Sequence, residues 1–139
     1  MEFPTYTTIA ALGQIVNLTL TLLAIAVPIL CVLKGYRFFK TNLISIPIIC
    51  AIVILGAYLA DAYPLIQLHF MGFDFDGLSD TERLRAVEPA SRALATELYG
   101  SIFGIGWPLK AIFAMVMVLP YPAAVWTVIT LAKSVIKKA

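Results

Sequence analysis

The side chains that most often carry chemistry in proteins are scarce in this sequence. It contains one histidine, His69, and two cysteines, Cys31 and Cys50. A single histidine excludes haem held between two histidines of one chain, and we expect the two cysteines to be free buried thiols. There is no glycine-rich phosphate loop, no Ser/His/Asp set and no helical pair of metal-binding histidines. The sequence therefore predicts a protein that is not an enzyme and that holds no metal or other cofactor.

A group of carboxylates shortly after His69 has part of the pattern of a calcium-binding loop. If Gly77 is taken as the turn glycine, Gly72 falls at the first ligand position and Arg83 at the position of the bidentate glutamate. We therefore interpret the segment as a solvated acidic turn, with a weak cation site as the alternative. Arginines in the same region make a docking surface a further alternative. The residues assigned to docking or to a weak cation site are Asp74, Asp76, Asp80, Glu82, Arg83, Arg85 and Arg92.

Polar and small residues recur every three or four positions in the first uncharged segment. This polar stripe consists of Ala10, Gln14, Asn17, Thr21, Ala24, Pro28 and Cys31. The spacing places all seven on one side of a helix, where small residues allow close approach and amides or hydroxyls can form hydrogen bonds between helices. Three interpretations remain open: packing within the chain, an interface with another subunit, and the lining of a pore, in which Gln14, Asn17 and Thr21 would face water.

The elements that must position these residues are three long apolar segments. No Asp, Glu, Lys, Arg or His occurs in residues 5–33, 41–60 or 111–132, charged residues make up 13% of the chain, and the mean hydropathy is +0.94. A helix of about 20 apolar residues crosses a bilayer. The sequence therefore predicts an all-α integral membrane protein with one domain, residues 1–139. Its predicted parts are transmembrane helices at about 8–33, 43–63 and 109–132, a connector at 34–42, an outer loop at 64–108 and a basic tail at 133–139.

The sign of the charges predicts how the helices are oriented. The connector and the tail contain only cations, six in all, whereas all eight carboxylates lie elsewhere with four cations. Because lysine and arginine in short loops stay in the cytoplasm, we expect the N-terminus outside and the C-terminus inside. The predicted location is a bacterial inner (plasma) membrane. In the outer loop, residues 79–82 have the pattern of a capping box, and we expect short amphipathic helices over about 80–99.

The third transmembrane helix has two alternatives that depend on Lys110. A helix over 109–132 begins near Pro108 and lets Lys110 reach the outer headgroups, but Pro120 and Pro122 then kink it. A helix over 98–119 followed by an interfacial helix over 123–138 puts Lys110 near the bilayer centre, at a cost of about 2.5–3.5 kcal/mol. We favour the first alternative. Lys110 and Asp61 are then both charges at the outer membrane boundary.

These features favour a small non-catalytic subunit that assembles through the polar stripe and the outer loop. Its expected partners are the lipid bilayer and other copies of itself or other membrane subunits, with no nucleic acid. A homo-oligomeric pore is the alternative, because the layout resembles that of class I phage holins, in topology alone. An envelope sensor or inhibitor, with a ligand bound by the acidic loop, is a third hypothesis.

Overall fold

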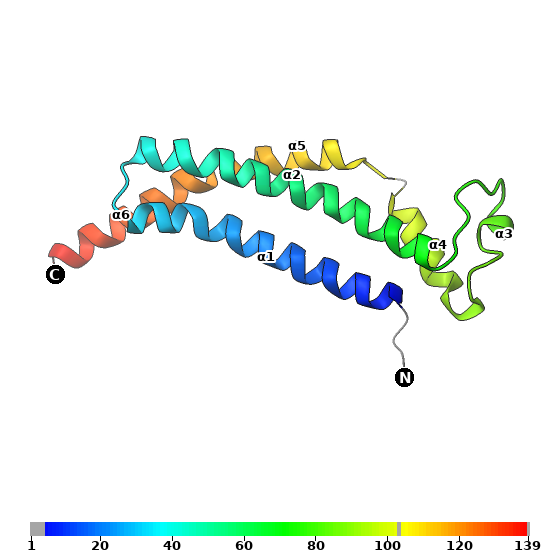
Figure 1. Ribbon diagram of the computed structural model, residues 1–139. Coiled ribbons are helices and arrows are strands. Elements are labelled where there is room, and N and C mark those ends of the chain that lie inside the picture. The colour runs from blue at the N-terminus through cyan, green and yellow to red at the C-terminus, as the bar shows by residue number, and fades with distance from the viewer. Residues whose placement is uncertain (1–4, 103, 139) are drawn as a thin grey trace. The chain divides into compact units, whose positions relative to one another are not determined.

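The computed structural model describes residues 5–102 and 104–138, and this part of the chain is helical with no strand. The helices are α1 (Thr5–Leu33), α2 (Phe38–Phe70), α3 (Asp80–Arg83), the 3₁₀ turn η1 (Pro89–Ser91), α4 (Arg92–Ile102), α5 (Trp107–Val118) and α6 (Tyr121–Lys138), shown in Figure 1. Three segments are long and apolar enough to cross a membrane: Tyr6–Leu33, Phe38–Phe70 and Trp107–Lys137. The prediction of an all-helical protein with three candidate membrane helices is therefore confirmed.

Both long helices end in the same backbone motif, which a glycine makes possible. After α1, the N–H of Tyr36 donates to the carbonyl of Cys31 at 3.1 Å, and the N–H of Gly35 donates to that of Val32 at 3.0 Å. An equivalent pair of bonds follows α2, with Gly72 in the place of Gly35. Both glycines have φ of 78°. This is the Schellman motif, whose left-handed position glycine adopts without strain; it fixes where the two helices stop.

The helix boundaries differ from the predicted membrane spans in two places. The predicted second span, 43–63, lies inside α2, which begins at Phe38 and ends at Phe70. Hydropathy reports the part of a helix that lipid can cover, whereas the glycine motif sets its end. At the third span, α4 ends at Ile102 and α5 begins at Trp107, as in the first alternative. A second break at Leu119 and Pro120 then separates α5 from α6, because proline has no N–H for a helical bond.

The helices contribute to two compact units. The first unit comprises Met1–Asn17 and Ala57–Lys110, and the second comprises Leu18–Gly56 and Ala111–Ala139. The core of the first unit lies where the end of α2 meets the following loop and α4. It contains Leu68, Met71, Phe73, Val87 and Ala95. This small core gives the acidic loop a defined structure, as buried apolar area does in any domain.

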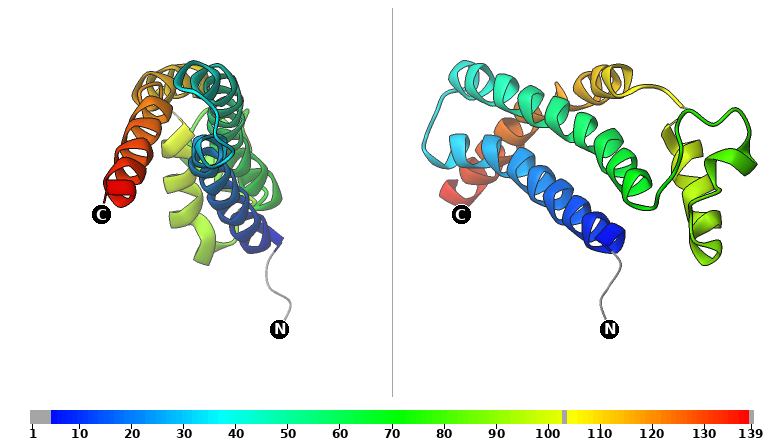
Figure 2. Two further views of the ribbon diagram at one scale, coloured as in Figure 1. Left: turned by 90° about the vertical axis from the view of Figure 1, so that its left-hand side faces the viewer. Right: turned by 45° about the vertical axis from the view of Figure 1, so that its right-hand side comes forward.

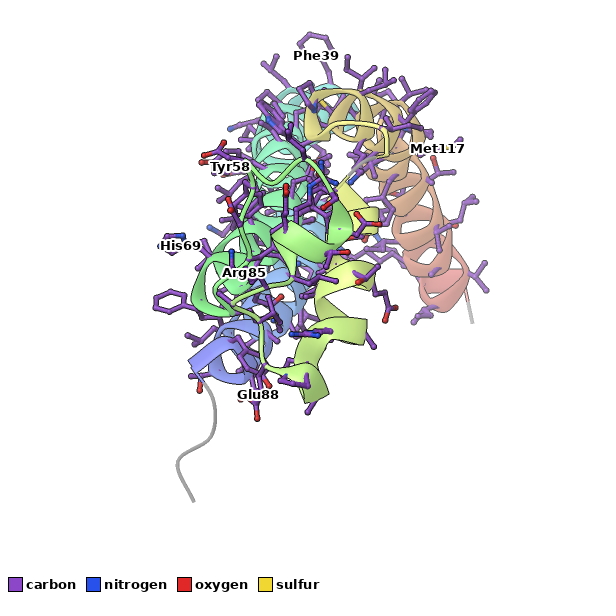
Figure 3. All side chains as sticks on the ribbon, turned by 90° about the vertical axis from the view of Figure 1, so that its right-hand side faces the viewer. Phe39, Tyr58, His69, Arg85, Glu88 and Met117 are labelled. Carbon is purple, nitrogen blue, oxygen red and sulfur yellow. The ribbon has the colours of Figure 1, made fainter. Side chains whose placement is uncertain are left out.

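In the second unit, α1 and α2 run antiparallel from the turn at Gly35 (Figure 2). Small and polar side chains are buried where they meet: Thr41 and Ser45 are both 0% exposed. The outer surface is apolar. Phe39 and Met117 are 76% and 77% exposed, and their side chains point away from the helices (Figure 3). Exposed side chains of this kind suit contact with lipid, since water would penalise them.

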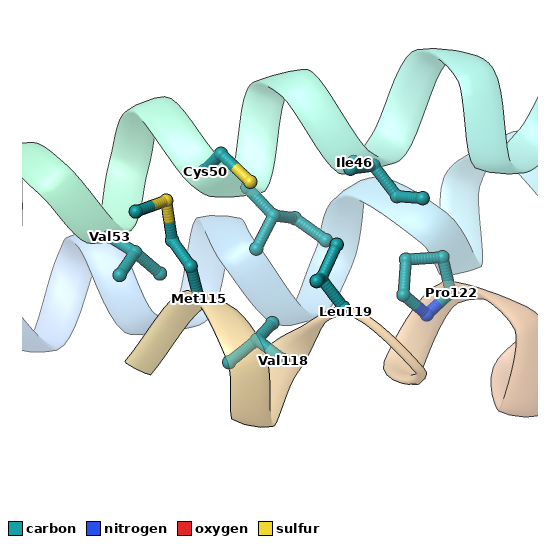
Figure 4. A pocket seen from close by; sticks show the side chains of 8 residues that line it. Ile46, Cys50, Val53, Met115, Val118, Leu119 and Pro122 are labelled. Carbon is teal, nitrogen blue, oxygen red and sulfur yellow. The ribbon is translucent and has the colours of Figure 1, made fainter. Parts of the chain in front are cut away.

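The break between α5 and α6 packs against α2 in the second unit. Figure 4 shows Leu119 and Pro122 beside Ile46, with Cys50 and Met115 farther along α2 and α5. The cavity that they line measures about 10 Å³, at the lower limit for one water molecule, and its walls are mainly apolar. The hydroxyl of Tyr121 donates to the carbonyl of Ile25 at 2.9 Å. This bond ties the start of α6 to α1 at the point where the proline break interrupts the helix.

Candidate functional site: a groove between α1, α2 and α4

The first unit contains an open groove of about 420 Å³ between three helices. Its lining residues are Tyr6, Thr7, Ala10, Gly13, Gln14 and Asn17 from α1, Ala60, Tyr63, Pro64 and Gln67 from α2, and Leu94 and Leu98 from α4. Several of these side chains are exposed, so the groove is open on one side. Its volume falls within the range of about 300–1,000 Å³ that is typical of ligand sites.

Close contact between a glycine and a tyrosine forms the floor of the groove. A Cβ atom added to Gly13 would lie 3.0 Å from the ring of Tyr63, closer than a side chain tolerates without movement of the ring. Gly13 is buried, and the absence of a side chain lets α1 and α2 approach here. Gly13 sits beside the polar stripe in the helix, so the stripe as predicted omitted a residue that matters for packing.

Three hydrogen-bonding side chains hold the end of the groove together. The Gln67 amide donates to the carbonyl oxygen of Tyr6 at 3.0 Å, which connects α2 to the first turn of α1. The hydroxyls of Tyr6 and Ser91 lie 3.0 Å apart, which connects α1 to the turn before α4. Gln67 and Ser91 are each 7% exposed. Buried polar groups that form hydrogen bonds fix the positions of the elements that carry them. These bonds therefore hold the walls of the groove in place.

The lining of the groove is polar in part but carries no charge among its described residues. Gln14 and Thr7 are exposed at its edge, and the ring of Tyr63 and the side chains of Leu94 and Leu98 supply apolar surface. An amide offers both donors and acceptors. The groove can therefore accept an uncharged ligand or protein segment that has an apolar face and a few hydrogen-bonding groups.

The polar stripe is divided between the two units. Ala10, Gln14 and Asn17 line the groove of the first unit. In the second unit, Pro28 and Cys31 are buried, Ala24 is half-buried and Thr21 is exposed. The Ser45 hydroxyl donates to the sulfur of Cys31 at 3.7 Å. The part of the stripe in the second unit is thus used mainly for packing within the chain, whereas the part in the first unit opens onto the groove.

Two of the carboxylates of the loop hold backbone amides. Asp74 accepts from the N–H of Asp76 at 3.0 Å, and Glu82 accepts from the N–H of Leu78 at 2.9 Å. Ser79 caps α3 by accepting from the N–H of Glu82 at 3.3 Å, so the predicted N-cap is confirmed. The Glu82 side chain reaches Leu78 instead of Ser79, a variation on the capping box.

The loop arginines differ in how far they are engaged. Arg83 donates from Nε to the carbonyl of Gly77 at 2.8 Å, approaches Asp80 at 3.4 Å and lies over the ring of Tyr99. Arg92 donates to the carbonyl of Val87 at 3.2 Å. Arg85 is exposed (Figure 3). In the described residues, no three His, Cys, Asp or Glu side chains are grouped closely enough to bind a metal ion.

The two charges predicted at the membrane boundary meet in an ion pair. Lys110 Nζ lies 2.6 Å from Asp61 Oδ1, and the side chains are 38% and 14% exposed, respectively. One turn away on each helix, the rings of Tyr58 and Trp107 meet edge to face with centroids 5.7 Å apart. The pair joins α2 to the first turn of α5. Asp61 thus supplies a counter-charge for Lys110, the charge on which the two alternatives for the third helix depended.

Sequence reasoning missed the residues that complete the groove from α2 and α4. Tyr63, Gln67, Leu94 and Leu98 lie far from the stripe in the chain, and no local pattern connects them with it. The one available signal was Gly13, which extends the run of small residues beside Ala10. Comparisons of the chain with protein-family models, with curated proteins and with solved structures gave no significant match. The geometry of the groove and the distribution of charge are therefore the features of the molecule that bear on its function.

Proposed function

We propose that α1, α2 and the segment from α5 to α6 cross a bilayer, with the acidic loop outside and the C-terminus in the cytoplasm. Two ring contacts support this placement. Phe38 meets Trp126 at 5.3 Å within the second unit, and Tyr58 meets Trp107 at 5.7 Å within the first. Aromatic rings favour the membrane–water interface. Along α2, about 20 residues separate Phe38 from Tyr58, and their rise of about 30 Å equals the thickness of the hydrocarbon.

The distribution of charge over the two units supports the same placement. Every carboxylate side chain of the sequence belongs to the first unit, whereas the second unit contains six cations and no carboxylate side chain. The ion pair between Lys110 and Asp61 then falls at the outer headgroups, where a charged pair can stay partly hydrated. The cations fall on the cytoplasmic side.

On this basis the protein is a non-catalytic membrane subunit, and its groove binds a helix of another subunit. The observation that carries the proposal is the convergence of two regions that are far apart in sequence. Ala10, Gln14 and Asn17 of the polar stripe and the helix α4 of the loop line one groove. Each region was a candidate for assembly by itself, and together they form the concave, mixed surface that partner segments use.

The shape and chemistry of the groove favour a helix as the occupant. Three helices form its walls, and Leu94 and Leu98 present apolar surface at helical spacing, as in grooves that accept an amphipathic helix. The groove begins close to the membrane, because its lining residue Ala60 directly precedes Asp61 of the ion pair at the outer headgroups. A partner anchored in the same bilayer can therefore reach it without a long linker.

Filling the groove tests this function. Ala10→Trp places an indole in the groove, whereas Leu12→Trp places one on a part of α1 that is 53% exposed and outside the groove. Each protein is purified gently and its assemblies are weighed by native mass spectrometry, with helicity by circular dichroism as a check on folding. We expect the wild type and Leu12→Trp to keep a partner, or a second copy, and Ala10→Trp to lose it. A wild type that is always a lone monomer would refute the proposal.

A homo-oligomeric pore is the second candidate, because Thr21 is exposed on the stripe within the second unit. In a pore its side chain would face water. With Cys31 and Cys50 replaced by alanine, a Thr21→Cys variant in intact membranes then reacts with a charged, water-soluble thiol reagent. Absence of labelling, together with labelling of the exposed Arg85→Cys from the outer side, would exclude the pore.

A further inference from the structure

The last three turns of α6 have two chemically distinct faces. Lys133 and Lys137 share one face at a spacing of four residues. Val128, Val135 and Ile136 occupy the other face and are 65%, 66% and 76% exposed. A helix with such faces is stable where one side meets an apolar phase and the other meets water.

The start of this segment lies beside the basic connector between α1 and α2. Trp126 Nε1 donates to the carbonyl of Tyr36 at 3.2 Å, and its ring packs edge to face on Phe38. The connector region also carries Lys34, Arg37 and Lys40, and all of these residues belong to the second unit. Because the second unit contains no carboxylate side chain, none of its cations can be neutralised by an acidic side chain of that unit.

The chain does not need these three turns to cross the membrane. From Trp107 to Trp126 it has about 20 residues, which is enough for one crossing. Residues 127–138 would then project from the interface at Trp126. If they continued straight into water, the apolar side chains of Val128, Val135 and Ile136 would stay solvated, which is unfavourable.

We propose that residues 127–138 lie along the surface of the leaflet at this end of the second unit and bind anionic phospholipids. The apolar face enters the boundary of the acyl chains. Lys133 and Lys137, together with the cations of the connector, contact the acidic headgroups. An acidic protein or a nucleic acid could match the charge, but it would leave the apolar face in water. A lipid surface satisfies both faces at once.

The preference for anionic lipid can be measured beside Trp126. The full-length protein with Trp107→Phe is placed in bilayers that contain brominated phosphatidylglycerol or brominated phosphatidylcholine, and quenching of Trp126 gives their relative binding. We expect phosphatidylglycerol to bind more tightly, with a preference that falls in high salt. Each lysine near a charged surface contributes about a fivefold preference. Lys133→Gln with Lys137→Gln should therefore lower the preference strongly, and Lys133→Arg with Lys137→Arg should retain it.

A second measurement follows the helix itself. In nanodiscs with phosphatidylglycerol, the amide hydrogens of residues 127–138 should exchange more slowly than in discs of phosphatidylcholine alone. Equal quenching by the two lipids, or equal exchange in the two kinds of disc, would overturn the proposal. Slower exchange only after addition of an acidic polypeptide such as polyglutamate, or of RNA, would also overturn it and assign the surface to a soluble partner.

Discussion

Replacing Asp61 with asparagine should destabilise the junction between α2 and α5 by an amount that the structure bounds. The ion pair with Lys110 is short, at 2.6 Å, and the Asp61 side chain is largely shielded, but Lys110 is 38% exposed. Breaking a fully buried pair costs about 3–5 kcal/mol, whereas an exposed pair contributes about 0–1 kcal/mol. Because Lys110 can still reach water, we expect a loss of about 1–2 kcal/mol.

A double-mutant cycle separates the pair from other effects of the substitutions. The free energy of unfolding is measured in mixed micelles by titration with a denaturing detergent, for Asp61→Asn, Lys110→Gln and the double variant. We expect the double variant to lose less than the sum of the single variants, with a coupling of about 1 kcal/mol. Strictly additive losses, within about 0.3 kcal/mol, would refute the ion pair as a stabilising contact. Exchanging the two charges should restore part of the stability.

Two further substitutions test the walls of the groove and the fold of the loop. Gly13→Ala forces a methyl group against the Tyr63 ring at 3.0 Å, whereas in Gly56→Ala the nearest atom outside the local backbone is at 4.0 Å. Because alanine favours a helix by about 1 kcal/mol, we expect Gly56→Ala to unfold above the wild-type temperature and Gly13→Ala at or below it. The reverse order would contradict the close contact. Arg83→Ala removes the bonds to the loop and should speed amide exchange over residues 73–88, whereas the exposed Arg85→Ala should leave exchange unchanged; equal effects would contradict the role of Arg83.

The all-helical fold and its three candidate membrane spans could be predicted because they depend on local composition. Uncharged runs, the capping box near Ser79 and the proline near the start of α5 each act within a few residues. The glycine motifs at Gly35 and Gly72 are also local. They lie just before and just after α2, and they explain why this helix extends beyond its predicted span. The separation of carboxylates from most cations was visible in the sequence. That the carboxylates all belong to one packed unit was not.

The groove could not be predicted, because it depends on contacts between residues far apart in the chain. Gly13 packs against Tyr63, and Lys110 forms an ion pair with Asp61, and in each case the two residues are about fifty positions apart in the chain. Neither residue has a local pattern that names its partner. The polar stripe was recognised as a feature of one helix, but a heptad pattern does not say which neighbour covers each part of it. Only the tertiary structure divides the stripe between buried packing and an open groove.

The most direct test of the docking groove is site-specific photo-crosslinking in intact membranes. A benzophenone amino acid is placed at Gln14, within the groove, or at Leu12, two residues away and outside it. A docked helix predicts one adduct of defined mass from position 14 and none from position 12, and the adduct should vanish when Ala10→Trp is added. No adduct from position 14, or the same adduct from both positions, would contradict the binding of a partner helix in the groove.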